Sequence, residues 1–240
     1  MASTSETGHN KNVANFMTAY QILEEMGSIY KPSNENLLLP NLEQKKQALS
    51  AVMTALNDKK PIYKNVVASR ENTIARLGKT MTKVLSYTRS LNISDTDKEN
   101  IANQIKKIRG DKKTKKIDPA NAEVATISTS QMSYDSRIAN LATVIKQLAS
   151  HPEYNPNETE IQIESLQAYQ LELSDLSTVV NAAGNTMIST RNNRNKELYA
   201  DDQNIIDLMK GIKSYVKSLG EVGKPYYKAL VKLKFTNILS

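Results

Sequence analysis

The stretch "YKPSNE", residues 30–35, returns later in the chain as "YNPNET", residues 154–159. Proline cannot continue a helix, and it restricts the backbone of the residue before it, so each cluster predicts the end of one helix. The polar residues after the proline are of the kind that begins a new helix. Each cluster therefore predicts a helix–turn–helix corner with its tyrosine packed as a plug, and the corner residues are Tyr30, Pro32, Tyr154 and Pro156. A ligand site built on the two tyrosines is the alternative.

The helix that follows each corner needs a capping residue at its start. Ser33 or Asn34 can supply this cap after the first corner, and Asn157 can supply it after the second. Glu160 follows Asn157 by three residues, which is the spacing of a capping box.

The two corners belong to a longer repeat. The offset of 124 residues between the tyrosines also pairs leucines further along the chain, such as Leu42 with Leu166 and Leu49 with Leu173. Related stretches lie at similar offsets: "VANFMT" (13–18) with "IANLAT" (138–143), "VVASREN" (66–72) with "MISTRNN" (187–193), and "SYTRSLN" (86–92) with "SYVKSLG" (214–220). These collinear matches predict a tandem duplication whose copies pack as one pseudo-twofold domain. The predicted order is a disordered tail (1–11), a first helical repeat (12–110), a basic and polar linker (111–131) and a second helical repeat (132–235).

Few turn-forming residues interrupt the chain, which has 8 Gly and 7 Pro among 240 residues. Long elements are the expected result, and this favours helices over many short strands. Each repeat is predicted to contain a short helix (13–28 and 132–149), a long second helix and a third helix (97–108 and 223–233). The predicted fold is all-α: an elongated bundle of about six helices, with a long coiled-coil-like second helix in each half.

The long helices carry apolar residues at the spacing of a coiled-coil seam. We expect Pro61 to kink or interrupt the first long helix. Residues 199–204 are expected to interrupt the second, with Asp201 or Asp202 as the new cap. The seam residues are Leu42, Leu49, Met53, Leu56, Tyr63, Val67, Ile74, Leu77, Met81, Val84 and Leu91 in the first helix, and Leu166, Leu173, Val180, Met187, Leu198, Ile205, Ile212 and Leu219 in the second. Both helices end before a residue that favours the left-handed C′ conformation, Asn92 or Gly220.

Five longer stretches stand out: "ISTSQMSYDSRIANL" (127–141), "YNPNETEI" (154–161), "RNNRNKELY" (191–199), "KSYVKSLG" (213–220) and "YYKALVKLKF" (226–235). Together they resemble a family of bacterial all-helical hypothetical proteins with an internal duplication. The resemblance covers nearly the whole chain and is strongest in its second half. The family has no assigned activity, so the resemblance implies the architecture and carries over no functional residue. The chain departs from the expected Gly-x-x-Ser-Pro-x-Tyr corner at "GEVGKPYY" (220–227), where Pro225 and Tyr227 keep the proline and the tyrosine.

The composition narrows the classes of function. The chain has no cysteine, which excludes disulfides, thiolate metal sites and a cysteine nucleophile. Its first residues are polar and lack the apolar core of a signal peptide, and no apolar run is long enough to span a membrane. We therefore expect a cytoplasmic protein, with export by a signal-less route left open. The formal net charge of +7 is moderately basic.

Residue patterns that carry chemistry are scarce. The two histidines, His9 and His151, have no partner at metal-ligand spacing and are expected at the surface. The sequence contains no glycine-rich phosphate loop, no Glu-x-x-His pair and no G-x-S-x-G elbow. It therefore predicts a non-enzymatic protein without a cofactor.

Arg70 and Arg191 occupy equivalent positions in the two repeats, each seven residues before a seam leucine. Both are therefore expected to face the interior or its edge. The simpler interpretation is a structural arginine that packs its stem or pairs with an acid. The functional interpretation is an anion site on the pseudo-twofold axis.

The basic run "KKIRGDKKTKK", residues 106–116, bridges the two repeats. It can be a solvated linker, or it can contact phosphates or another anionic surface. It holds no aromatic residue on which a base could stack, so recognition of single strands is poorly supported. The cationic residues of the run are Lys106, Lys107, Arg109, Lys112, Lys113, Lys115 and Lys116.

Three functions follow from these patterns. The leading hypothesis is a structural or protein-interaction protein that binds another protein or itself, as a homo-oligomer or filament. The second is a protein that binds nucleic acid or another polyanion through residues 106–116 and the basic C-terminal lysines, Lys224, Lys228, Lys232 and Lys234. The third and more remote is a helical pore-forming or membrane-acting component, and an enzyme ranks lowest. The chain's most apolar short stretches, such as residues 138–145, have instead the pattern of an amphipathic core helix.

Overall fold

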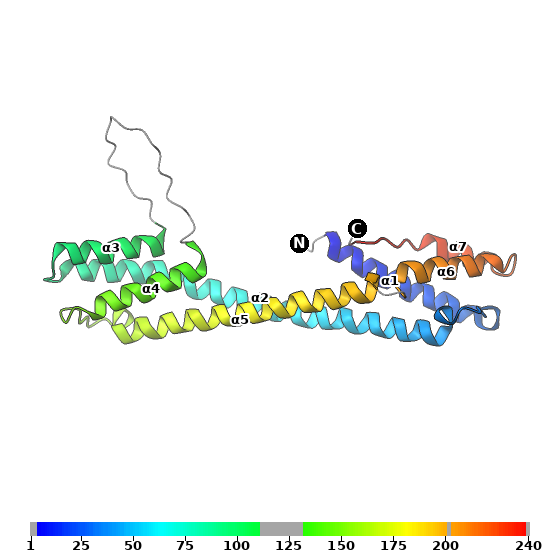
Figure 1. Ribbon diagram of the computed structural model, residues 1–240, viewed down its shortest axis with the longest axis horizontal. Coiled ribbons are helices and arrows are strands. Elements are labelled where there is room, and N and C mark those ends of the chain that lie inside the picture. The colour runs from blue at the N-terminus through cyan, green and yellow to red at the C-terminus, as the bar shows by residue number, and fades with distance from the viewer. Residues whose placement is uncertain (1–3, 111–131, 201–202, 239–240) are drawn as a thin grey trace, which may run out of the picture. The chain divides into compact units, whose positions relative to one another are not determined.

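The computed structural model describes residues 4–110, 132–200 and 203–238, and every regular element within these ranges is a helix (Figure 1). The predicted all-α class is therefore confirmed. The helices are α1 (Thr4–Met26), α2 (Leu39–Ser90), α3 (Asp95–Arg109), α4 (Tyr134–Ala149), α5 (Ile163–Asn195), α6 (Ile205–Ser218) and α7 (Lys224–Lys232). Short 3-10 turns follow α1 and precede α2 and α5, and a π-helix, η5 (Lys196–Ala200), follows α5 directly.

The chain forms two compact units, which we call the terminal unit (residues 1–62 and 185–240) and the central unit (residues 63–184). The boundary between them falls inside α2 and inside α5, so both long helices contribute to both units. Each unit therefore combines chain from before and after the predicted linker. The prediction that the repeats 12–110 and 132–235 pack as one pseudo-twofold domain stays a prediction.

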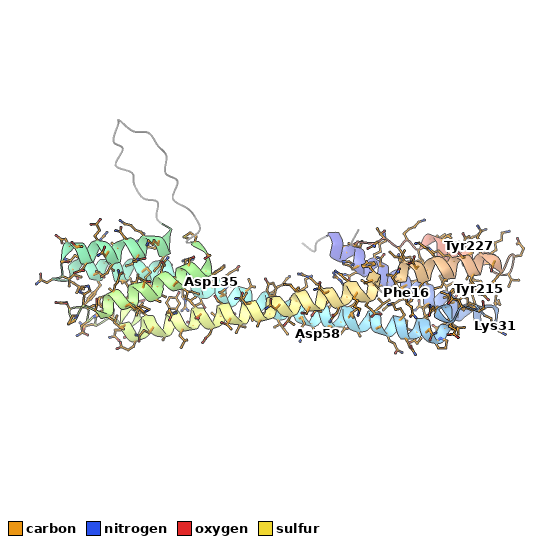
Figure 2. The ribbon with its side chains drawn as sticks, in the orientation of Figure 1. Phe16, Lys31, Asp58, Asp135, Tyr215 and Tyr227 are labelled. Atoms are coloured by element: carbon orange, nitrogen blue, oxygen red, sulfur yellow. The ribbon has the colours of Figure 1, made fainter. Side chains whose placement is uncertain are left out.

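The core of the terminal unit is formed by α1, the first part of α2, the π-helix, α6 and α7. Phe16 and Leu23 of α1 are fully buried, and Figure 2 marks Phe16 in this core. They pack with Leu42 and Leu49 of α2 and with Leu198 of the π-helix. Burying each such side chain contributes about 1.5–3 kcal/mol relative to leaving it in water. The seam predicted for this part of the chain is therefore the buried face.

The core of the central unit is formed by the second part of α2, α3, α4 and the first part of α5. Helices α3 and α4 lie side by side (Figure 1), and the Arg137 Nε on α4 donates to the Ile108 carbonyl at the end of α3, at 3.0 Å. The seam residues Leu77 and Met81 of α2 and Leu166 and Leu173 of α5 are fully buried. Tyr63, which was predicted to lie on the seam, is 36% exposed.

Each predicted corner is plugged by its tyrosine. The Tyr30 hydroxyl donates to the Leu37 carbonyl at 2.8 Å, and the Tyr154 hydroxyl donates to the Ile161 carbonyl at 2.7 Å. Each ring also makes an edge contact with a second tyrosine, with ring centroids 5.3 Å apart in both units. The ring partners are Tyr215 for Tyr30 and Tyr87 for Tyr154.

The proline of each corner is also buried, as expected for Pro32 and Pro156. In the terminal unit, the backbone N–H of Lys31 donates to the Tyr215 hydroxyl at 2.9 Å, and Figure 2 shows these two residues close together. The corner is therefore a structural joint in which both tyrosine hydroxyls have hydrogen-bond partners.

Of the three predicted caps, two differ from the structure. Asn34 is a cap, as predicted: its side chain accepts from the backbone N–H of Asn36 and begins the 3-10 turn that precedes α2. After the second corner the capping position is Glu158, which makes no side-chain cap, so the capping box from Asn157 to Glu160 is wrong. Asn204 caps α6 by accepting from the Asp207 N–H at 2.9 Å, so the assignment of that cap to residue 201 or 202 is wrong, and both positions lie outside the described residues.

Pro61 does not interrupt α2, which is one helix from Leu39 to Ser90. Proline removes one backbone hydrogen bond, to the carbonyl of Asn57 four residues earlier. Pro61 and Asn57 are both exposed, so water can bind the freed carbonyl. The buried seam on either side then holds the helix together.

The predicted left-handed helix ends are half correct. Gly220 has a φ of 64°, and Gly110 after α3 has a φ of 74°. Among the described residues only glycines have a positive φ, so the prediction that Asn92 adopts the left-handed conformation is wrong. Asparagine tolerates this conformation less readily than glycine, and the chain turns there without it.

We predict that Tyr30→Phe and Tyr154→Phe each lower the free energy of unfolding by about 1 kcal/mol at pH 7, because each leaves a buried carbonyl without its donor. Urea denaturation measures this loss, and Tyr63→Phe, on an exposed ring, is the control. Equal stability of all three variants would contradict the role of the corners.

The same tyrosines predict a loss of stability at alkaline pH. Burial raises the pKa of both Tyr30 and Tyr154, so the folded chain prefers the neutral phenol. Their contribution is complete below the unfolded pKa of about 10 and is lost as the pH rises above it. The double variant should therefore lose less stability between pH 9 and pH 11 than the natural chain.

Two glycines should respond to alanine in opposite ways. Gly78 lies inside α2 with nothing within 4 Å of an added Cβ, so Gly78→Ala should stabilise the chain by about 0.5–1 kcal/mol. At Gly110 the left-handed backbone and the Met132 sulfur, 2.6 Å from an added Cβ, should make Gly110→Ala destabilising by about 1 kcal/mol. Thermal unfolding of both variants provides the measurement, and shifts of the same sign would contradict the assignment.

Candidate functional site

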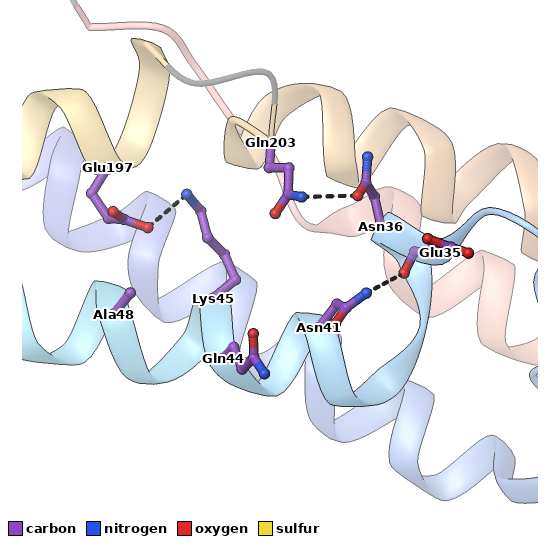
Figure 3. Close-up of a pocket in the computed structure, with 8 residues that line it drawn as sticks. All are labelled: Glu35, Asn36, Asn41, Gln44, Lys45, Ala48, Glu197 and Gln203. Carbon is purple, nitrogen blue, oxygen red and sulfur yellow. Dashed lines mark hydrogen bonds and ion pairs between the residues drawn. The ribbon is translucent and has the colours of Figure 1, made fainter.

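A polar groove of about 720 Å³ lies in the terminal unit, where α2 begins (Figure 3). Residues of α2 form one wall, and residues next to the first corner and around the π-helix complete it. The lining residues are Glu35, Asn36, Asn41, Gln44, Lys45, Ala48, Glu197 and Gln203. We call this the terminal groove.

The charged centre of the terminal groove is an ion pair between Lys45 and Glu197. The Lys45 Nζ lies 2.7 Å from a carboxylate oxygen of Glu197, and the two side chains are 7% and 25% exposed. Figure 3 shows the lysine reaching from α2 to the glutamate on the π-helix. A lysine buried to this degree needs a partner, because an unpaired buried charge is costly.

Three side-chain amides of the terminal groove are also hydrogen-bonded. The Gln203 Nε2 donates to the Asn36 Oδ1 at 2.8 Å, and the Asn41 Nδ2 donates to the Glu35 carbonyl at 2.7 Å (Figure 3). The lining thus offers carboxylates, amides and one ammonium group. Such a surface can hydrogen-bond a polar segment of another molecule, and it presents no nucleophile that is paired with a base.

A second groove, of about 580 Å³, lies in the central unit, and we call it the central groove. Lys83 forms an ion pair with Glu160, and an Arg76 nitrogen lies 3.9 Å from a Glu172 carboxylate oxygen. All four of these side chains are half exposed or more. The lining residues are Arg76, Lys79, Thr80, Lys83, Glu160, Ser165, Ala168, Tyr169 and Glu172.

Tyr169 is the one aromatic side chain in the lining of the central groove. Its hydroxyl donates to the Thr73 carbonyl at 2.5 Å, and the Arg76 guanidinium lies 5.6 Å from the centre of its ring. Burial raises the pKa of the Tyr169 phenol. The ring is therefore fixed between the two long-helix segments of this unit.

The two grooves occupy matching positions in the sequence. Four lining positions of α2 are separated from four lining positions of α5 by the same 124 residues that separate the corner tyrosines. The pairs are Asn41 with Ser165, Gln44 with Ala168, Lys45 with Tyr169 and Ala48 with Glu172. The charges differ: the terminal groove has one more acid than base, and the central groove has one more base than acid.

His9 is a buried residue that the sequence interpretation missed. Helix α1 begins at Thr4, inside the predicted tail, and His9 is 2% exposed, so its placement at the surface is wrong. Its Nδ1 lies 2.9 Å from the Tyr199 hydroxyl, which also accepts from the Asn12 Nδ2 at 2.9 Å. His9 precedes Phe16 and Leu23 at seven-residue steps, and this heptad spacing was the available signal.

Asn12 joins this cluster to the end of the chain. Its Nδ2 donates to the Thr236 carbonyl at 2.7 Å, and its Oδ1 accepts from the Thr236 N–H at 3.2 Å. Burial raises the pKa of the Tyr199 phenol in the same cluster. These contacts attach the segment after α7 to α1, which is a structural task.

The predicted arginine pair is not a pair in the structure. Arg70 is half-buried, with its guanidinium 3.9 Å from the centre of the Tyr134 ring, which fits the expected interior edge. Arg191 is exposed, so its expected inward position is wrong. Arg194 is the buried arginine of α5, 3% exposed, and it donates to the Asn195 Oδ1 at 2.8 Å. The 124-residue offset pairs Arg70 with Arg194, three residues and most of a helical turn from Arg191.

Only the first part of the basic run lies in the described residues. Lys106 and Lys107 are exposed and Arg109 is half-buried in the last turn of α3, where cations favour the carbonyl end of the helix. The remaining lysines of the run, Lys112, Lys113, Lys115 and Lys116, lie outside the described residues. His151, the second histidine, is half-buried at the end of α4.

Residues 4–110, 132–200 and 203–238 hold neither a candidate metal cluster nor a candidate membrane span. No group of three or more His, Asp or Glu side chains there is placed to hold a metal ion. None of the helices there combines the length and the apolarity needed to cross a bilayer. No protein-family model, curated protein or solved structure matches the chain, so the resemblance to a bacterial helical family stays a prediction.

The ion pairs of the two grooves should contribute differently to stability, because the pair of the terminal groove is mostly buried and the Lys83–Glu160 pair of the central groove is exposed. Glu197→Gln should lower the free energy of unfolding by about 1–2 kcal/mol, because Lys45 then remains buried without its counter-charge. Glu160→Gln removes the partner of an exposed lysine and should cost less than about 0.5 kcal/mol. Urea denaturation compares the two, and equal losses would contradict the assignment of the terminal pair as the structural one.

Proposed function

We propose that the chain is a non-enzymatic scaffold protein, built from two diverged copies of one helical repeat, with one docking groove in the terminal unit and one in the central unit. The observation that carries the proposal is the matching position of the terminal and central grooves at the 124-residue offset. A protein with two like sites can join two partner molecules and gain affinity from holding both.

The two corners support the duplication. Tyr30 and Tyr154 each donate to a carbonyl seven residues later in the chain. Their ring partners, Tyr215 and Tyr87, are themselves equivalent residues of the matching stretches "SYVKSLG" and "SYTRSLN". In the terminal unit the first copy supplies the corner tyrosine and the second copy supplies its ring partner. In the central unit these roles are exchanged. Contacts that match in this way support a common origin of the two copies.

The chemistry of the grooves favours docking. Lys45 pairs with Glu197 in the terminal groove and Lys83 pairs with Glu160 in the central groove, and the terminal groove also holds two hydrogen bonds from side-chain amides. A partner can exchange these contacts for its own, which gives specificity at modest affinity. The Thr80 hydroxyl of the central groove donates to the Arg76 carbonyl of its own helix at 3.3 Å, and not to a basic side chain that could activate it.

The opposite net charges make a second copy of this chain the first partner to test. The acidic excess of the terminal groove and the basic excess of the central groove would attract one another between molecules. A contact between unlike surfaces is head-to-tail, and such contacts can continue into rings or filaments.

Light scattering on a sizing column tests this proposal with nucleic-acid-free protein. We expect a mass that is a multiple of 26.8 kDa at low salt and that falls at high salt, since exposed charges are screened. Reversal of one groove, by Glu35→Lys or by Lys79→Glu, should give monomers, and the two changes together should restore association. Lys59→Glu, on a residue outside both grooves, is the control. A natural chain that is monomeric at every salt and concentration would overturn self-assembly.

A further inference from the structure

The positive charge of the terminal unit is gathered on its last two helices. Residues 205–235 hold seven lysines and two carboxylates, so this stretch carries a net charge of +5 in a chain of net charge +7. The lysines are Lys210, Lys213 and Lys217 on α6, Lys224, Lys228 and Lys232 on α7, and Lys234 just after α7. We call this set the lysine face.

The helical spacing arranges these lysines in two rows. Lys224, Lys228 and Lys232 follow one another at four-residue steps, about 6 Å apart along the axis of α7. All three are exposed, while Leu230 of the same helix is fully buried, so the row points away from the core. Residues 210, 213 and 217 form the corresponding row on α6.

The two rows meet where the chain leaves α7. The Lys213 Nζ donates to the Leu233 carbonyl at 2.8 Å and lies 5.5 Å from the centre of the Phe235 ring. Burial, and next the nearby charge of Lys234, lower the pKa of Lys213. Two ammonium groups therefore repel one another at this point, and an anion placed there would relieve the repulsion.

The carboxylates of the stretch do not neutralise this face. Asp207 pairs with Lys210 at 2.8 Å and Glu221 pairs with Lys224 at 3.0 Å, each three residues apart on the chain. Among the described residues no ion pair is found for the other five lysines, Lys213, Lys217, Lys228, Lys232 and Lys234.

We propose that the lysine face binds the phosphate backbone of a nucleic acid. The proposal is independent of the scaffold function, because neither groove contains a residue of this face. Lysine contacts phosphates as a point charge, whereas base readout relies mostly on planar, bidentate groups, so the binding should not depend on sequence. This places the polyanion contact on α6 and α7 and leaves residues 106–116 outside the site.

The burial pattern favours a nucleic acid over a membrane surface. A helix that binds a bilayer inserts its apolar face into the lipid. The apolar residues of α6 and α7, such as Met209, Ile212, Val216 and Leu230, are buried in the core of the terminal unit. Val222, 59% exposed in the turn between the helices, is the one large apolar side chain exposed on this stretch. A single valine gives little insertion energy.

Fluorescence anisotropy of the full chain with a labelled 30-base-pair DNA of random sequence tests the proposal. Five phosphate contacts predict a slope of about −4.5 for log K against log salt, which is about 500-fold weaker binding at 200 mM than at 50 mM KCl. The double variant Lys228→Gln/Lys232→Gln should bind at least tenfold more weakly at 50 mM, with the slope reduced by about 1.8.

Two matched variants separate a site from net charge alone. Lys59→Gln/Lys64→Gln removes two exposed lysines of α2 and should bind like the natural chain. Substitution of Lys112, Lys113, Lys115 and Lys116 by Gln should also leave most of the affinity. Equal weakening by the α7 and α2 pairs, loss of binding on substitution of residues 112–116, or binding to phosphatidylserine vesicles that DNA does not displace would each overturn the proposal.

Discussion

The structure depends on the burial of one apolar seam along each long helix, α2 and α5, and each of these helices contributes to both units. In α2 the seam is buried by the terminal unit at Leu42, Leu49 and Leu56, and by the central unit from Ile74 to Val84. A helix of 52 residues presents more apolar surface than one small group of neighbours can cover. Each long helix therefore takes its partners from both halves of the chain, and the short helices complete the two cores.

The corners fix where that seam starts. At each corner a buried proline ends the preceding segment, and a tyrosine hydroxyl donates to a carbonyl of the 3-10 turn that precedes the long helix. Both grooves begin next to a corner, and most of their lining side chains are on α2, α5 or the π-helix. The lysine face lies on α6 and α7, whose apolar sides are already used in the core. The core side and the lysine side of these two helices are thus separate.

Much of this could be predicted from the sequence, because the seam and the corner chemistry are local patterns. The all-α class and most of the seam leucines were correct, and the interruption expected at residues 199–204 falls where the π-helix ends and α6 begins. The missed features depend on tertiary contacts. His9 is buried because Tyr199 and Asn12 reach it across the fold, and Arg191 is exposed because the core takes Arg194 instead. Pro61 is tolerated because the carbonyl that loses its hydrogen bond belongs to an exposed residue and can bind water. The grooves were not predicted because their lining residues are far apart in the chain.

Cleavage of the folded chain tests most directly whether each unit is built from both halves. A protease site placed within residues 117–125 would be cut after purification of a chain that carries an affinity tag at its N-terminus. We predict that the tagged half retains the untagged half on the affinity resin and that the pair elutes on sizing at the same volume as the uncut chain in the same buffer. Release of the untagged half as a separately folded fragment, without denaturant, would contradict the account.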